Sequence, residues 1–139
     1  MKVSVRLENE FIPSWNGNEE DESPIVVVHK RPTIALRDKL IPKPRLKIRV
    51  TPGANGEEQA QVGETEVVID NRRLVEEMVT EIKNLVVEIP DSKGEVKERE
   101  ITKGTELFAD WVPAELGELA DEIGRHLQSA LSHRVDSKN

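Results

Sequence analysis

The sequence predicts an α+β domain with strands in its first half and helices in its second. Apolar residues alternate with polar ones, or form short β-branched runs, through residues 1–69. After Asp70 they recur mainly at steps of three and four, which is helical spacing. The chain has 139 residues, the size of one domain. We therefore expect a single domain with strands and loops over 1–69, and helices over 70–139 interrupted by a hairpin near 86–101.

Three segments of the first half have strand patterns. Met1 to Glu8 alternates apolar and polar residues, which predicts a half-buried strand. Ile25 to Val28 is continuously β-branched, which predicts a strand buried on both faces. Leu46 to Val50 alternates with basic residues, and we expect it to pair with Val67 to Ile69 across an intervening loop.

The connections between these segments also have local signals. The segment from Phe11 to Asn18 contains the pair Asn16–Gly17 and predicts a turn anchored by its two aromatic residues. Residues from Ile34 to Ile41 form a weakly amphipathic pattern that Pro42 ends, which predicts a short helix.

The second half contains two helical patterns around a hairpin. The first predicts a helix of about four turns with Asp70 as its N-cap, and its apolar positions are Leu74, Val75, Met78, Ile82 and Leu85. The second extends from Pro113 to Val135 and is a long amphipathic C-terminal helix. Gly117 and Gly124 share one face of it, where they either admit a neighbouring helix closely or are surface glycines that weaken the helix.

Composition excludes several kinds of chemistry. The chain has no cysteine, which excludes a disulfide scaffold, a thiolate zinc site and a cysteine nucleophile. Phosphate-loop, calcium-loop and G-x-S-x-G motifs are missing from the sequence. Glu122 and His126 have i,i+4 spacing, but no third metal ligand is evident, and His133 lies about 10 Å further along the helix. We expect no enzyme activity, no cofactor and no metal.

Charge is unevenly distributed along the chain. The net charge is −7, yet the segment from Lys30 to Arg49 has eight basic residues and one acid, 8 − 1 = +7, which leaves −14 elsewhere. This asymmetry predicts a surface for an acidic partner, with candidate residues Lys43, Arg45, Lys47 and Arg49. The alternative is a basic face that pairs with the protein's own acids. Nucleic acid is a less favoured partner because the basic segment has no aromatic residue.

Membrane insertion is not expected from the sequence. No apolar run approaches the roughly 20 residues of a membrane-spanning helix, and residues 1–8 lack the apolar core of a signal peptide. We expect the protein to be located in a cytoplasm.

Several segments resemble small siphophage tail assembly chaperones encoded near the tape measure protein. The similar segments cover most of the chain, and they are Phe11-Ile12-Pro13, Trp15-Asn16-Gly17-Asn18, Val26 to Thr33 and Glu77 to Leu85. In that family a strand leads through a Pro-Thr pair into a short helix, and an α-helical half follows. The resemblance implies no catalytic residues.

The resemblance implies a protein that binds the tape measure protein, tail tube subunits or both, in the host cytoplasm. The last helix is then the expected client-binding element, through Leu116, Leu119, Ile123, Leu127 and Leu131. The alternative is that this stripe packs into the protein's own core. A second functional hypothesis is a structural tail or connector subunit that is retained in the virion. A third and less favoured hypothesis is a small nucleic-acid-binding regulator. A homo-oligomer is also compatible with the sequence.

Overall fold

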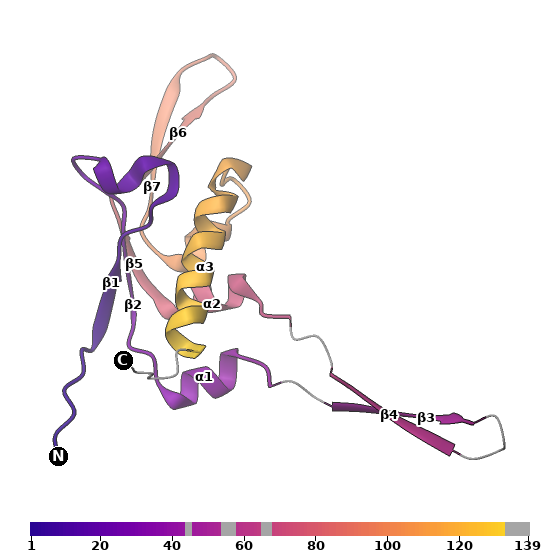
Figure 1. The fold of residues 1–139 in the computed structure, drawn as a ribbon. Helices are drawn as coiled ribbons and strands as arrows, with labels where there is room; N and C mark the ends of the chain where they lie inside the picture. The colour runs from indigo at the N-terminus through magenta and orange to yellow at the C-terminus, as the bar shows by residue number, and fades with distance from the viewer. Residues whose placement is uncertain (44–45, 54–57, 65–67, 133–139) are drawn as a thin grey trace.

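A computed structural model describes residues 1–43, 46–53, 58–64 and 68–132, with the backbone alone over 46–52 and 58–64. The α+β class is confirmed (Figure 1). The strands are β1 Glu8–Phe11, β2 Val26–Lys30, β3 Leu46–Pro52, β4 Glu58–Glu64, β5 Val79–Lys83, β6 Leu85–Pro90 and β7 Val96–Ile101. The helices are α1 Ile34–Leu40, α2 Asn71–Met78 and α3 Gly117–Ser132, with 3₁₀ turns η1 Trp15–Glu20, η2 Gly104–Phe108 and η3 Ala114–Leu116.

The body of the protein is a small antiparallel sheet covered by helices. Its strand order is β1-β2-β5, and α2 and α3 pack together on one side of it (Figure 1). The buried apolar residues of these elements form one core with α1 and β6, and Val27, Leu74 and Ile123 are fully buried within it. The β-branched run at Ile25 to Val28 was predicted as a buried strand, and β2 confirms it.

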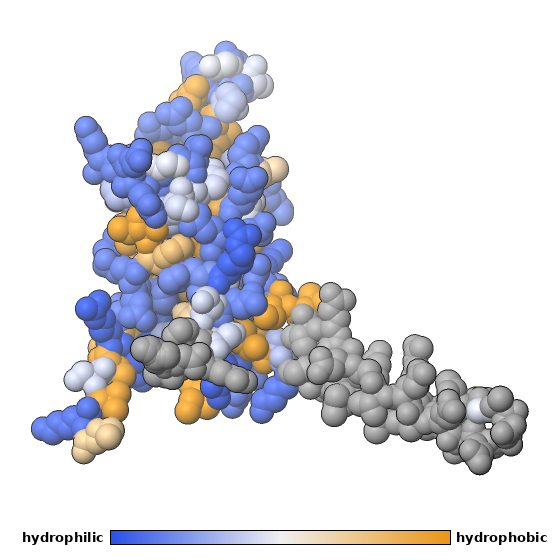
Figure 2. Space-filling model, in the orientation of Figure 1, coloured by the Kyte–Doolittle hydropathy of each residue, from blue (hydrophilic) through white to orange (hydrophobic). Residues whose placement is uncertain are grey.

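The predicted strand over Met1 to Glu8 is wrong. Strand β1 begins at Glu8, which pairs with Lys30. Directly before the strand, the Leu7 carbonyl oxygen accepts a hydrogen bond from the Arg31 amide. Strand β2 ends at Lys30, so residues 1–6 have no neighbouring strand in the described structure. Val3, Val5 and Leu7 are exposed, and Figure 2 shows hydrophobic surface at this end of the molecule.

Strand β3 pairs with a segment that was not predicted. Its partner is β4, Glu58–Glu64, in a regular antiparallel register from Leu46–Glu64 to Pro52–Glu58. The expected partner is wrong: Val68 and Ile69 are not in a strand, and Val67 lies outside the described residues. A nearer partner closes a shorter loop, which costs less conformational entropy.

The predicted four-turn helix is two turns long. Helix α2 ends at Met78, and the chain continues at once into β5, which pairs with β2. Asp70 is confirmed as the N-cap, since its carboxylate accepts a hydrogen bond from the Arg73 amide at 3.2 Å. Val79 and Ile82 are buried in strand β5, and both would also be buried on the apolar face of a longer helix. The segment forms a strand because it pairs with the edge of β2.

The hairpin predicted near 86–101 is confirmed as β6 and β7. The Asp91 carboxylate accepts hydrogen bonds from the backbone amides of Lys93 and Glu95, and Gly94 has a positive φ of 82°. A glycine adopts that conformation without the steric cost that a β-carbon adds. The turn therefore holds the two strands in register.

The two glycines of α3 have different surroundings. A Cβ on Gly124 would lie 2.7 Å from Cβ and Cγ of Asn71 in α2, whereas a Cβ on Gly117 would have no atom within 4 Å. Gly124 thus allows α2 and α3 to approach closely, and Gly117 is an open position at the start of the helix.

These surroundings predict opposite results for alanine at the two positions. Gly117→Ala should leave the free energy of unfolding unchanged or raise it by roughly 0.5 kcal/mol, because alanine favours the helix. Gly124→Ala should lower it by about 1 kcal/mol or more, because the close contact outweighs that gain. Urea unfolding of both variants checks this, and equal stabilities would contradict the close packing at Gly124.

Candidate functional site

The predicted client-binding stripe of α3 and η3 lies in the core. Leu119, Ile123 and Leu127 have no exposed surface, while Leu116 is 6% and Leu131 is 3% exposed. The interpretation of these five residues as a client-binding surface is therefore wrong for the folded chain. The sheet and α2 complete their own core with this stripe, and all five residues belong to one buried cluster with Val27, Leu74 and Ile82.

The basic residues predicted for an acidic partner are only partly described. Lys43 is exposed, Arg45 lies outside the described residues, and Lys47 and Arg49 lie in β3, where the backbone alone is described. The alternative, pairing with the protein's own acids, is seen among the described residues of the basic segment, where Arg37 lies 3.8 Å from Asp38 and Lys39 pairs with Glu77. Lys39 in α1 contacts Glu77 in α2 at 3.1 Å and lowers the pKa of the Glu77 carboxyl.

The β3–β4 hairpin is a ribbon of two strands that stands apart from the body in Figure 1. Its backbone register sets Ile48 opposite Val62 and Val50 opposite Ala60, so apolar residues occupy facing positions. Lys47 and Arg49 alternate with these residues along β3. Alternation assigns Ile48 and Val50 to one face of the ribbon, together with Glu58 and Glu64 at its ends, and assigns the basic residues to the other. We call these two strands, residues 46–52 and 58–64, the hairpin arm.

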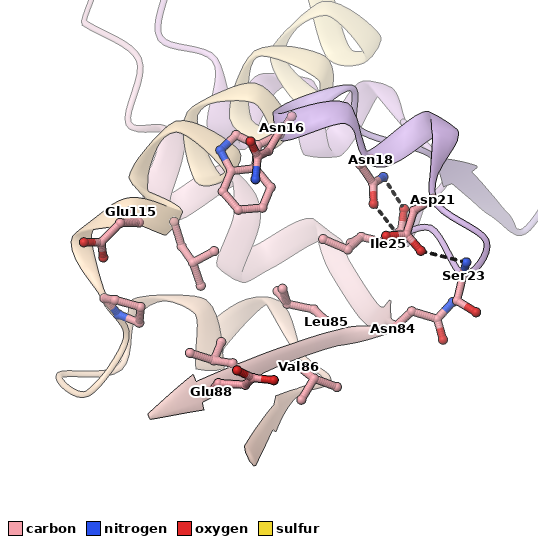
Figure 3. Close-up of a pocket in the computed structure, with 14 residues that line it drawn as sticks. Asn16, Asn18, Asp21, Ser23, Ile25, Asn84, Leu85, Val86, Glu88 and Glu115 are labelled. Atoms are coloured by element: carbon pink, nitrogen blue, oxygen red, sulfur yellow. Dashed lines mark hydrogen bonds between the residues drawn. The ribbon is translucent and has the colours of Figure 1, made fainter. Parts of the chain in front are cut away.

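Two adjoining hollows flank Trp15 at the start of α3, and together we call them the Trp15 groove. Their cavity volumes are about 330 and 480 Å³. The first lies between η1, β6 and the segment before α3 (Figure 3), and the second lies over the first turns of α3. Six carboxylates and one guanidinium line them, from Asp21, Glu88, Glu115, Glu118, Asp121, Glu122 and Arg125.

A buried asparagine shapes the wall of this groove. The Asn18 side chain donates hydrogen bonds to the carbonyl oxygens of Pro13 and Ile25, and its own oxygen accepts from the Ile25 amide at 2.7 Å. These bonds close the η1 loop and compensate for burial of the amide. Asn16 and Gly17 adopt positive φ in the same turn. The predicted turn, with Phe11 and Trp15 packed against the core, is thereby confirmed.

A carboxylate on α3 attaches the η1 loop to the helix. Glu122 accepts a hydrogen bond from the Ser14 backbone amide at 2.7 Å and a longer one from the Ser14 hydroxyl. These bonds hold the loop against the helix, and Trp15 lies between the two hollows. A half-buried tryptophan surrounded by carboxylates favours a cationic ligand over an anionic one.

A second cluster joins the sheet to α3 through two histidines. His29 in β2 is 1% exposed, and its Nε2 lies 3.3 Å from Nε2 of His126. The His126 ring stacks on Phe11 of β1, with ring centroids 3.8 Å apart. The cluster has no local sequence signal, because its two histidines are 97 residues apart in the chain.

The hydrogen bonds assign the protons of this pair. Nδ1 of His29 lies 2.9 Å from the Lys30 carbonyl oxygen, which accepts only, so this nitrogen carries a proton. Nε2 of neutral His29 then has a lone pair and accepts a hydrogen bond from Nε2–H of His126. A second proton on His29 would place two N–H groups against each other and break the contact.

This arrangement predicts that acid weakens the fold. Burial holds the pKa of His126 below its ordinary value, a positive charge on His29 would lower it further, and Glu122 acts in the opposite direction. Because folding lowers this pKa, the stabilisation is fully present above pH about 6.5 and is lost as the pH falls through the folded value. Urea unfolding between pH 8 and 5 should show this loss. His126→Gln should flatten the dependence, and an identical profile in that variant would contradict the assignment.

Comparison with known proteins gave no matching family model, no similar curated protein and no similar solved structure. Within the described ranges, no three side chains of His, Cys, Asp or Glu are grouped closely enough to hold a metal ion. No helix in the described part of the chain has the length and apolar content to cross a bilayer.

Proposed function

We propose that this chain is a non-catalytic assembly protein of a phage tail that acts by binding other proteins. Its expected partners are the tape measure protein and tail tube subunits. Residues 11–33 resemble siphophage tail assembly chaperones, and this resemblance supports a role in tail assembly. The hairpin arm is the single observation that carries the binding role.

The arm has the properties of a binding element. Within the described residues, its two strands lie chiefly beside each other. An isolated hairpin of two strands is only marginally stable in water, so a partner that covers its apolar face stabilises both molecules. The basic residues Lys47 and Arg49 on the alternate positions favour an acidic segment of that partner.

A capture experiment with the tape measure protein tests the proposal. Co-expression with the intact chain should yield a soluble complex, and K47E/R49E should reduce the captured amount several-fold, more strongly at low salt. The matched control is K93E/K97E, which makes the same charge change on exposed positions of the β6–β7 hairpin. Equal capture by the intact chain and both variants would overturn the role of the arm.

A structural subunit of the tail or connector is the second candidate function. The burial of the α3 stripe favours it, because a chaperone that holds long apolar client helices needs an exposed apolar surface. Mass spectrometry of purified particles separates the two functions. Presence in a fixed stoichiometric amount supports the subunit, and absence from particles that contain the tape measure protein supports the chaperone.

A further inference from the structure

We infer that two copies of this chain associate by pairing residues 1–9 of each, antiparallel, across the free edge of β1. The inference needs only this chain and is independent of the proposed phage function. It rests on an edge strand, on exposed apolar residues that continue it, and on charges that complement themselves when the segment meets its own copy.

Strand β1 is an edge of the sheet. The strand order β1-β2-β5 gives it one neighbour, β2, and leaves its other side without a strand in the described structure. An open edge presents unpaired backbone N–H and C=O groups, which template the addition of another strand. Residues 1–7 precede this edge directly and extend beyond the body at the lower left of Figure 1.

The segment before β1 has a strand sequence but no strand partner among the residues that the structure describes. Val3 is 80% exposed, Val5 is 60% exposed and Leu7 is 84% exposed. These residues share the odd positions with Phe11, which packs against His126 of α3. A strand that continued β1 backward would therefore carry all three on the face that Phe11 directs to the core. A second strand beside it would cover part of this apolar surface.

Charge complementarity identifies the occupant as a second copy. The even positions begin with Lys2 and Arg6 and end with Glu8 and Glu10. An antiparallel pair of identical segments brings the basic end of one against the acidic end of the other. The contact is isologous, so each favourable pair occurs twice about a two-fold axis.

The register with Val5 on the two-fold axis satisfies both the apolar and the charged positions. With Val5 on the two-fold axis, Val3 of each copy faces Leu7 of the other, and Lys2 faces Glu8. A shift by one residue would set apolar against polar positions. A shift that puts Arg6 on the axis would set two guanidinium groups against each other. Opposite charges across strands stabilise a pair, and like charges weaken it.

Disulfide trapping tests this register directly because the chain has no cysteine of its own. Val5→Cys places two thiols opposite each other on the axis, where cross-strand Cα atoms are about 4.5–5.5 Å apart, within disulfide range. Mild oxidation of the full chain should give a covalent dimer in high yield. The matched control is Val86→Cys, an exposed valine in β6, which should remain monomeric on a denaturing gel.

A charge exchange tests the same contact without a covalent bond. Sedimentation equilibrium should show a dimer for the intact chain, with dimerisation weakened about tenfold by Lys2→Glu and restored by Lys2→Glu with Glu8→Lys. Val5→Lys should give a monomer with the same circular dichroism spectrum. A monomeric intact chain at all accessible concentrations, or equal cross-linking at Val5 and Val86, would overturn the inference. A dimer unaffected by these changes would place the interface elsewhere and also overturn it.

Discussion

Replacing Leu127 with alanine is expected to lower the free energy of unfolding by about 2–5 kcal/mol. The side chain has no exposed surface and belongs to the core that α3 forms with α2 and the sheet. Truncation loses the transfer energy of the removed carbons and leaves a cavity. This loss is a large share of the roughly 5–15 kcal/mol that stabilises a domain. Urea unfolding measures it.

Leu127→Met is the matched control, because it keeps the side-chain volume and should cost less than about 1.5 kcal/mol. Glutamate at Leu119 or Leu127 should prevent folding, since it buries an unpaired charge. If either glutamate variant stayed folded with native stability, the stripe would be surface, and the original interpretation of α3 as a client-binding helix would be restored.

Gly104→Ala is expected to be the most damaging change among the glycines considered. A Cβ at this position would lie 2.6 Å from the carbonyl oxygen of Val75 and 2.8 Å from Cβ of Val79. The first of these atoms belongs to the backbone where α2 meets β5, so it has little freedom to move away. We expect a loss of about 1–3 kcal/mol in the free energy of unfolding.

Thr105→Ala, at the next and exposed position, is the control for this change. It should stay within about 0.5 kcal/mol of the intact chain, as surface substitutions usually do. Thermal unfolding of the two variants side by side checks the contrast. Equal midpoints would mean that η2 and α2 pack less closely than the structure shows.

Local chemistry explains which elements could be predicted from the sequence. Asp70 caps α2 through its own first turn, and Asp91 and Gly94 close the β6–β7 turn within five residues. The α3 stripe was also recognisable, since its spacing depends on the helix alone. Whether that stripe faces a client or the core depends on how the other elements of the fold pack. The residue spacing within α3 carries no information about that packing.

The remaining features depend on contacts between distant residues. Helical and strand positions coincide near Val79, so pairing with β2 ends α2 at Met78 instead of near Leu85. Strand β4 has only Ala60 and Val62 as apolar residues, so its sequence does not indicate a strand. It is recognised by its pairing with β3. His29 and His126 meet only after the sheet and α3 pack together. None of these three features has a local sequence signal.

Hydrogen exchange tests the central claim, that α3 is core and the hairpin arm binds the partner. The amides of Leu119 to Leu131 should exchange slowly in the free chain, because buried helices open only with large free energies. Adding the tape measure protein should slow exchange in 46–52 and 58–64 and leave α3 unchanged. The account would be contradicted if α3 exchanged fast throughout in the free chain, and if the tape measure protein slowed exchange in α3 and left the arm unaffected.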